Sequence, residues 1–225
     1  MVARAVLAPG ARTPPWGGGT VSKVAWAQLD GIGGLAEADL GPTMGCRPPT
    51  GPKAAQTAIL VPVPEAEEVV GRWRAVHDPK AGTGVPAHIT LIVPWLPPEQ
   101  LKPEHLAELD ALLAAQAAFD FVLDQVRWFG ERVLWLAPTP AEPFKELTSL
   151  LATHFGTQPW RGEFSEVVPH LTVGLAGYAV GRDMAEAAHD LCTKLPLECR
   201  ARWVDVMCGD GWDWRIVHHL ALRPG

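Results

Sequence analysis

From residue 55 onward, apolar residues recur with two spacings that predict an alternation of strands and helices. Short runs rich in Val, Ile and Leu, bounded by Pro or Gly, are typical of buried strands. Apolar residues three and four positions apart over a dozen residues indicate amphipathic helices. These patterns predict strands over residues 56–63, 88–93, 119–129, 132–137, 170–174, 197–207 and 212–222, and helices over residues 65–77, 99–118, 140–155 and 181–195.

The order of these elements is similar in two halves of the chain, residues 55–137 and 138–222. Each half alternates strands with helices and ends on a hairpin. We therefore predict an α+β fold with two lobes built from duplicated strand-helix-strand units. In this fold two antiparallel sheets would flank a central groove, with the helices on the outside.

One short pattern, His-x-Thr followed by an apolar residue, occurs twice in predicted strands, at His88 and Thr90 and at His170 and Thr172. Side chains two positions apart in a strand share a face, about 6–7 Å apart. Two such strands side by side would gather two imidazoles and two hydroxyl groups in one small space. That set can transfer protons beside a phosphate without a metal ion. One copy alone is better explained by a surface histidine, whereas two copies favour a catalytic pair.

Residues 1–54 differ in composition from the rest, since they hold ten of the 22 glycines and seven of the 22 prolines. We predict a disordered or poorly structured N-terminal extension there and one domain over residues 55–225. The first 54 residues hold five basic and three acidic residues, whereas the remainder holds 14 basic and 22 acidic ones, a net charge of −8. A domain this acidic has no broad nucleic-acid surface, so if it handles RNA it should grip one end of the strand or a small nucleotide.

The four cysteines include no Cys-x-x-Cys pair and are expected to be reduced thiols rather than disulfides or zinc ligands. No run of 18 or more apolar residues is present, and the apolar run after Met1 is short for a signal peptide. We expect a cytoplasmic protein with no membrane segment. A monomer without metal or cofactor is the starting hypothesis.

The paired motifs resemble the His-x-Thr/Ser-x signatures of the 2H phosphoesterases, and most of all the 2′-5′ RNA ligase and cyclic phosphodiesterase branch. Pro94 and Trp95 after the first motif and Pro169 before the second are part of this resemblance, which covers about residues 55–222. It implies a bilobal duplicated fold and metal-independent chemistry on cyclic phosphates or 2′-5′ linkages of RNA ends or small nucleotides. The catalytic residues that it implies are His88, Thr90, His170 and Thr172.

Opening a 2′,3′-cyclic phosphate needs a base for the attacking water and an acid for the leaving ribose oxygen, on opposite sides of phosphorus. Two histidines suit this reaction because one imidazole can be neutral while the other is charged. We assign His170 as the base and His88 as the acid, and the reverse assignment stays open. The hydroxyls of Thr90 and Thr172 would donate to non-bridging oxygens. The same pair could run the reverse reaction as 2′-5′ RNA ligation.

Three further residues are candidates for substrate binding: Trp95, Trp160 and Arg161. A tryptophan beside the groove could stack on a base, although core packing is the alternative for each of the ten tryptophans. Trp160 and Arg161 lie in the loop before the second motif, where a guanidinium could hold a terminal phosphate.

The expected function is hydrolysis of 2′,3′-cyclic phosphates on RNA ends or small nucleotides by two-histidine acid–base catalysis. One alternative is a non-catalytic module that binds phosphorylated RNA ends or nucleotides. Another is a zinc hydrolase that uses the histidines as ligands. Turnover of 2′,3′-cyclic AMP in the presence of EDTA would separate these three hypotheses.

Overall fold

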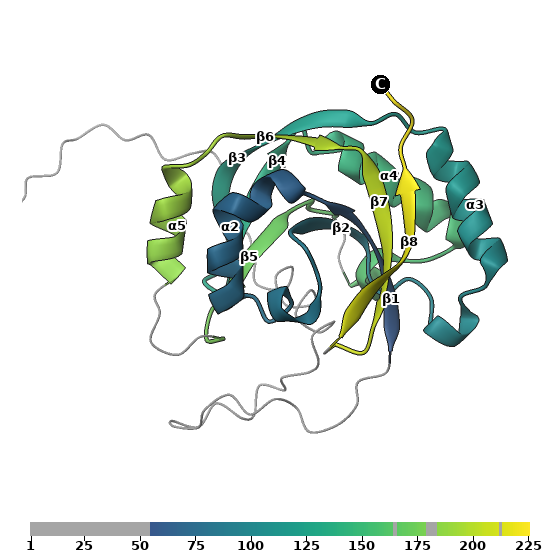
Figure 1. Ribbon diagram of the computed structural model, residues 1–225, viewed down its shortest axis with the longest axis horizontal. Coiled ribbons are helices and arrows are strands. Elements are labelled where there is room, and N and C mark those ends of the chain that lie inside the picture. The colour runs from purple at the N-terminus through teal and green to yellow at the C-terminus, as the bar shows by residue number, and fades with distance from the viewer. Residues whose placement is uncertain (1–54, 164–165, 179–183, 212) are drawn as a thin grey trace, which may run out of the picture.

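The structure, a computed structural model, describes residues 55–163, 166–178, 184–211 and 213–225 (Figure 1). The predicted extension over residues 1–54 lies outside the described residues and stays a prediction. The strands are β1 (Gln56–Pro62), β2 (His88–Ile92), β3 (Phe119–Phe129), β4 (Val133–Thr139), β5 (Leu171–Leu175), β6 (Leu197–Ala201), β7 (Trp203–Gly209) and β8 (Trp214–Ala221). The helices are α2 (Pro64–His77), α3 (Pro103–Ala114), α4 (Glu142–Phe155) and α5 (Met184–Cys192), with short 3-10 helices η1 (Ala81–Thr83), η2 (Pro98–Gln100) and η3 (Pro159–Gly162).

The eight strands form one antiparallel sheet in the order β6-β3-β4-β5-β2-β1-β7-β8, which Figure 1 shows as a curled arc. The α+β class predicted from the sequence is confirmed. The two expected sheets are continuous with each other, because Ile89 of β2 pairs with Leu171 of β5. This junction is short, and it lies inside the two His-x-Thr motifs. The centre of the sheet is therefore the place where the motifs meet.

Each half of the sheet takes strands from both parts of the chain. β1 and β2 lie beside the hairpin β7–β8, whereas β3 and β4 lie beside β5 and β6. The chain crosses between the halves at Arg202, because β6 pairs with β3 and β7 pairs with β1. The lobes expected over residues 55–137 and 138–222 are thus interleaved in the sheet. The hairpin predicted from residues 197–207 and 212–222 consists of β7 and β8 alone.

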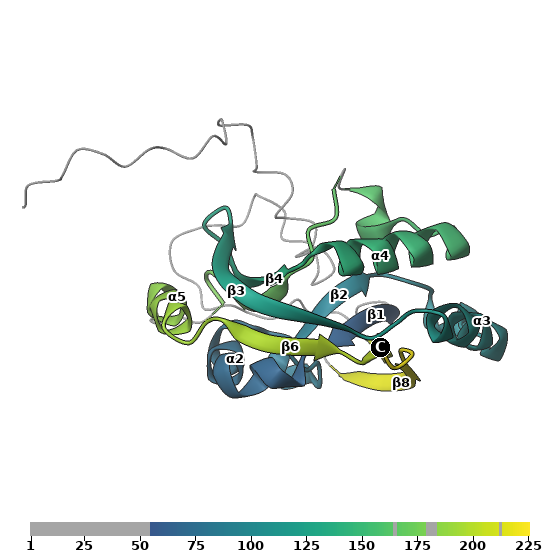
Figure 2. The same cartoon turned by 90° about the horizontal axis from the view of Figure 1, so that it is seen from above.

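The helices each bury one apolar stripe in a large core that they share with the sheet. Figure 2 shows α2 and α5 at one side of the curled sheet and α3 and α4 at the other. Val70 of α2, Leu113 of α3, Phe144 of α4 and Leu191 of α5 have no exposed surface. Burying a side chain of this size stabilises the fold by about 1.5–3 kcal/mol, so the helices hold the sheet firmly. None of the helices that the structure describes is both long and apolar enough to cross a membrane.

The helix predicted over residues 99–118 is shorter in the structure, where α3 begins at Pro103 and follows η2. A proline fits the first helical turn because its missing N–H would have no helical partner there. The residue before a proline is pushed toward extended angles, and Lys102 adopts φ −113° and ψ 158°. The apolar spacing did not reveal where the helix begins, because Leu101 precedes Pro103 and still fits the helical period.

Candidate active site

The polar residues of the two motifs lie on one face of the sheet, where β2 and β5 are paired. The apolar residues between each His and Thr are partners in this pairing and are fully buried in the core. Side chains alternate along a strand, so the register places His88 opposite Thr172 and Thr90 opposite His170 on the other face. The two histidines are then diagonal neighbours, about 7–8 Å apart. The structure thus brings all four motif residues together.

Each motif strand contains a β-bulge directly after its threonine. The pairing of β1 with β2 skips Leu91, and the pairing of β4 with β5 skips Val173. An extra residue changes the face that the following side chains occupy. Val93 and Leu175, three residues after the two threonines, therefore turn to the motif face and line its cavity. The two motif strands therefore repeat the same features around the site: a His-x-Thr motif, a bulge after the threonine, and an apolar side chain that lines the cavity.

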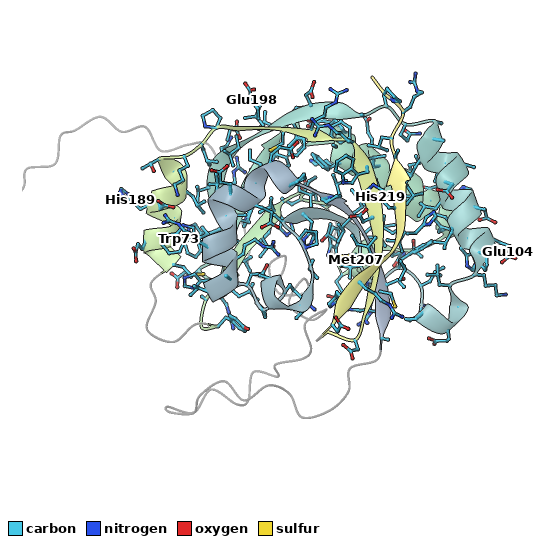
Figure 3. All side chains as sticks on the ribbon, in the orientation of Figure 1. Trp73, Glu104, His189, Glu198, Met207 and His219 are labelled. Atoms are coloured by element: carbon cyan, nitrogen blue, oxygen red, sulfur yellow. The ribbon has the colours of Figure 1, made fainter. Side chains whose placement is uncertain are left out.

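The cavity on this face has a volume of about 810 Å³, counting the open solvent at its mouth. His88, Thr90 and Thr172 line it. One wall is apolar, and its residues are Ala58, Leu60, Val85, Met207 (labelled in Figure 3) and Trp214. Cavities that combine apolar walls with a few polar groups are typical of small-molecule sites. The motif residues therefore lie where a phosphate ester with an apolar group attached can be held.

Both imidazoles are oriented by the same hydrogen bond to the backbone. Nδ1 of His88 lies 2.7 Å from the carbonyl oxygen of Pro86, and Nδ1 of His170 lies 2.6 Å from that of Val168. A carbonyl oxygen only accepts, so each Nδ1 carries the proton and donates it. The lone pair of each neutral ring is then on Nε2. Each histidine can therefore accept a proton at Nε2, while its Nδ1 donates to the backbone carbonyl.

His170 is the more deeply placed histidine, with 5% of its surface exposed. The rings of Phe129 and Trp135 meet its imidazole edge-on, with centroids 5.0 and 5.6 Å away. Its Nε2 is buried, and no group in the described part of the chain forms a hydrogen bond with it. A buried acceptor without a partner costs free energy, and a bound ligand would supply the missing partner.

Burial lowers the pKa of both imidazoles from the usual 6.5 to about 4. The pKa of His88 is lowered further by the positive charge of Arg74 and, to a smaller extent, by His170 and Lys80. The backbone bonds act in the opposite direction but do not offset burial. Both rings are therefore neutral at pH 7 when the cavity holds no anion.

A buried arginine lies beside His88, and the sequence reasoning missed it. Arg74 of α2 is 2% exposed and donates from Nε to Asp78 Oδ2 at 3.0 Å and from Nη2 to the carbonyl of Val85 at 3.1 Å. Its Nη1 lies 3.3 Å from Oε1 of Glu67. The available signal was spacing, because Arg74 follows the buried Val70 by four residues and precedes a carboxylate by four.

This arginine and its glutamate partner hold the segment that leads into the first motif. Arg74 bonds the carbonyl of Val85, and Glu67 accepts the backbone N–H of Ala87. The carbonyl of Pro86, which orients the first motif histidine, lies between these two anchored residues. The network therefore fixes the backbone group that sets the tautomer of His88.

None of the three predicted substrate-binding residues is among the described residues that line the cavity. Trp95 is a core residue, 4% exposed, and packs edge-on against Phe155 at 5.1 Å, which is the packing alternative stated above. The side chain of Trp160 is buried, and its backbone N–H donates to the carbonyl of Val93 at the end of β2. Arg161 is exposed, and a role for it at a terminal phosphate stays a prediction.

The adjacent histidines of β8 serve separate contacts. His218 bonds Asp110 of α3 at 3.1 Å, whereas His219, labelled in Figure 3, bonds Asp205 of β7 at 2.6 Å. Neighbouring strand residues point to opposite faces, so these two rings cannot bind one ion together. Within the described ranges, no group of three or more His, Cys, Asp or Glu side chains is arranged to hold a metal ion.

The chain is similar to a known protein family and to several solved structures. The family model described as the 2′-5′ RNA ligase superfamily matches residues 61–211. The crystal structure of TT0787 from Thermus thermophilus is 20% identical, has a TM-score of 0.52, and covers 75% of this chain and 98% of that one. Escherichia coli LigT complexed with 3′-AMP is 20% identical with a TM-score of 0.48, covering 76% and 99%. None of the curated proteins compared matches the chain.

Proposed function

Because the chain belongs to the 2′-5′ RNA ligase superfamily of 2H phosphoesterases, we propose that it is an enzyme that hydrolyses 2′,3′-cyclic phosphates on RNA ends or small nucleotides. The observation that carries the proposal is the register of β2 against β5, which gathers His88, Thr90, His170 and Thr172 on one face. His88, Thr90 and Thr172 line the cavity there. One phosphate group at this place would meet two imidazole Nε2 atoms and two hydroxyl donors. That is the set of groups that in-line opening of a cyclic phosphate requires.

In the proposed reaction one histidine takes a proton from water as the water oxygen attacks phosphorus. The other histidine gives a proton to the ribose oxygen as its bond to phosphorus breaks. The charges around the site favour His88 as the base, because Arg74 and Lys80 lie on its side and disfavour its protonated form. His170 then acts as the acid, which is the reverse of our first assignment. Thr90 and Thr172 donate to the non-bridging oxygens, where negative charge accumulates.

The acid needs a proton that neither imidazole holds at pH 7 before an anion binds, since burial lowers the pKa of both rings to about 4. The negative charge of a bound phosphate supplies the compensation, because an anion within a few ångströms raises the pKa of an imidazole. Substrate binding and protonation of His170 are therefore coupled. Burial keeps both rings neutral until a phosphate binds, and the bound phosphate then favours protonation of His170.

The charge of the chain outside its first 54 residues supports a substrate that enters by one end. That part has a net charge of −8, so long-range attraction for a nucleic-acid strand is weak. A terminal cyclic phosphate or a small nucleotide needs only the local contacts of the cavity. The same two histidines would catalyse 2′-5′ ligation when the reaction runs in the reverse direction.

The test is to replace each histidine by alanine and to assay hydrolysis of 2′,3′-cyclic AMP and of short RNA with a cyclic end, in EDTA. We expect each of His88→Ala and His170→Ala to lower the rate about 10²–10⁴-fold. His154→Ala, on the exposed side of α4, is the matched control and should stay close to wild type. If either motif variant kept most of its activity, the catalytic assignment would be refuted.

The same assay decides between the alternatives. Turnover that disappears in EDTA and returns with zinc would favour the metal hydrolase. Saturable binding of both substrates without turnover would favour the binding module. Metal-free turnover that depends on both histidines supports the proposal.

A further inference from the structure

The loop between α2 and β2 brings a lysine into the candidate site. Lys80 follows the end of α2 by three residues, and its backbone N–H donates to Oδ1 of Asp78 at 2.9 Å. This bond closes a tight turn that directs the loop back toward the sheet. Among the cavity-lining residues that the structure describes, Lys80 is the only lysine or arginine. The turn therefore determines where the side chain of Lys80 enters the cavity lining.

The lysine is held in place by an aromatic ring. Its Nζ lies 4.9 Å from the ring centroid of Trp214 in β8, which is the geometry of a cation–π contact. The indole is itself packed on Gly209, where a Cβ atom would lie 2.5 Å from the ring. Gly84, beyond the lysine in the same loop, approaches Trp214 so closely that a Cβ atom would lie 2.5 Å from its carbonyl oxygen. Loop and hairpin are thus in tight contact, and the ammonium group has a defined place.

The nearby carboxylate is already engaged by another cation. Oδ2 of Asp78 accepts from Nε and Nη2 of Arg74 at 3.0 and 2.9 Å, and Oδ1 accepts the backbone N–H of Lys80. Arg74 is therefore the main counter-charge of Asp78, and the charge of Lys80 acts on this carboxylate more weakly. Lys80 also lines the cavity. Its charge is close enough to the motif to disfavour protonation of His88.

Apart from Lys80, the described residues that line the cavity include no lysine or arginine. The two bulged strands contribute Val93 and Leu175 to the cavity, and β4 contributes Val133. The two threonine hydroxyls are neutral donors, and both motif imidazoles are neutral at pH 7. A phosphate anion in this cavity would therefore be poorly compensated without Lys80.

We propose that Lys80 is a phosphate-binding residue, whose ammonium group, held over Trp214, contacts a non-bridging oxygen of the substrate phosphate beside the two motifs. The inference rests on the proposed function and extends it by naming the group that neutralises the anion. Such a contact tightens as negative charge builds up on the oxygens, so it lowers both the binding and the activation free energy. A structural role, in which Lys80 only joins the loop to Trp214, predicts a change in stability without a change in phosphate affinity.

The test compares Lys80→Met, which keeps the apolar stem, with Lys80→Arg, which keeps the charge. Binding of inorganic phosphate is measured by calorimetry, and kcat/KM is measured with 2′,3′-cyclic AMP. We expect Lys80→Met to lower phosphate affinity and kcat/KM by about 10- to 100-fold each, the usual size of a hydrogen bond to a charged group. Lys80→Arg should recover a large part of both. Lys145→Met, which removes an exposed lysine of α4 outside the cavity lining, is the matched control and should leave both unchanged.

Thermal unfolding of every variant separates folding from binding, and Lys80→Gln replaces Lys80→Met if the latter loses its folded structure. A folded Met or Gln variant with phosphate affinity and kcat/KM within twofold of wild type would overturn the inference. If the wild-type protein hydrolysed no cyclic phosphate, the proposed function would fail instead. The phosphate-binding measurement would still decide the role of Lys80 in that case.

Discussion

The two buried histidines should make the protein lose stability when the pH falls below about 6.5. In the unfolded chain each imidazole titrates near 6.5, whereas burial lowers the pKa to about 4 in the folded protein. Between these values the unfolded state binds protons that the folded state excludes. The free energy of unfolding therefore decreases as the pH falls from 6.5 toward 4, and these two groups have no effect above that range.

The size of the effect follows from the two pKa values. A lowering from 6.5 to about 4 corresponds to about 3 kcal/mol per histidine once the pH reaches the folded value. At pH 5 the loss is about 2 kcal/mol for each ring and about 4 kcal/mol for both. Because many domains are stable by only about 5–15 kcal/mol, this loss should be easy to detect.

The perturbation is the double variant His88→Asn and His170→Asn. An asparagine amide can still donate to the carbonyl oxygen of Pro86 or Val168, but it does not titrate. Urea unfolding followed by circular dichroism at pH 7 and pH 5 gives the stability change for each protein. We expect the change in the double variant to be about 4 kcal/mol smaller than in the wild type.

An exposed histidine provides the control for this measurement. His154→Asn should show the pH dependence of the wild type, because its side chain lies at the surface of α4. A double variant that loses as much stability as the wild type between pH 7 and pH 5 would show that the motif imidazoles are not held neutral by burial. The account of a resting site with two neutral rings would then be wrong.

Two further predictions concern the packing that supports the site. Arg74→Met should lower the free energy of unfolding in urea by about 3–5 kcal/mol, because it leaves the carboxylate of Asp78 buried without its guanidinium partner; a loss below about 1 kcal/mol would show that the pair is dispensable. Gly174→Ala should cost about 1–3 kcal/mol in the same assay, because the new Cβ would lie 2.5 Å from Cβ of His77. Gly82→Ala has open space around the new methyl group and is its control, so equal losses in both variants would contradict the packing argument.

The elements that were easiest to predict are those whose signal is local. The helix predicted over residues 65–77 is observed as Pro64–His77, and the strands of the 119–137 hairpin are observed as β3 and β4. Within each motif, strand alternation alone put His and Thr on one face, because that rule concerns residues two positions apart. The threonines, His88 and the apolar neighbours lie where this rule placed them.

The charged groups around the site could not be predicted in the same way. Arg74 looked like an ordinary helix residue, and Lys80 looked like an ordinary loop residue. Their importance comes from partners on other elements, namely the carbonyl of Val85 and the indole of Trp214. For Trp95 the sequence suggested a place beside the groove, whereas the structure packs its side chain in the core. Burial of one side chain among ten tryptophans depends on the whole fold rather than on its neighbours in the chain.

The sequence by itself determined the periods of the strands and helices, the duplicated His-x-Thr spacing and the acidic balance of the domain. Each of these is a property of residues a few positions apart, or of a simple sum along the chain. Only the tertiary structure decided that β2 pairs with β5, that β6 and β7 belong to different halves of the sheet, and that Lys80 reaches the cavity. Strand pairing between segments 82 residues apart, and the burial that makes both imidazoles neutral, arise from contacts that exist only after the chain has folded.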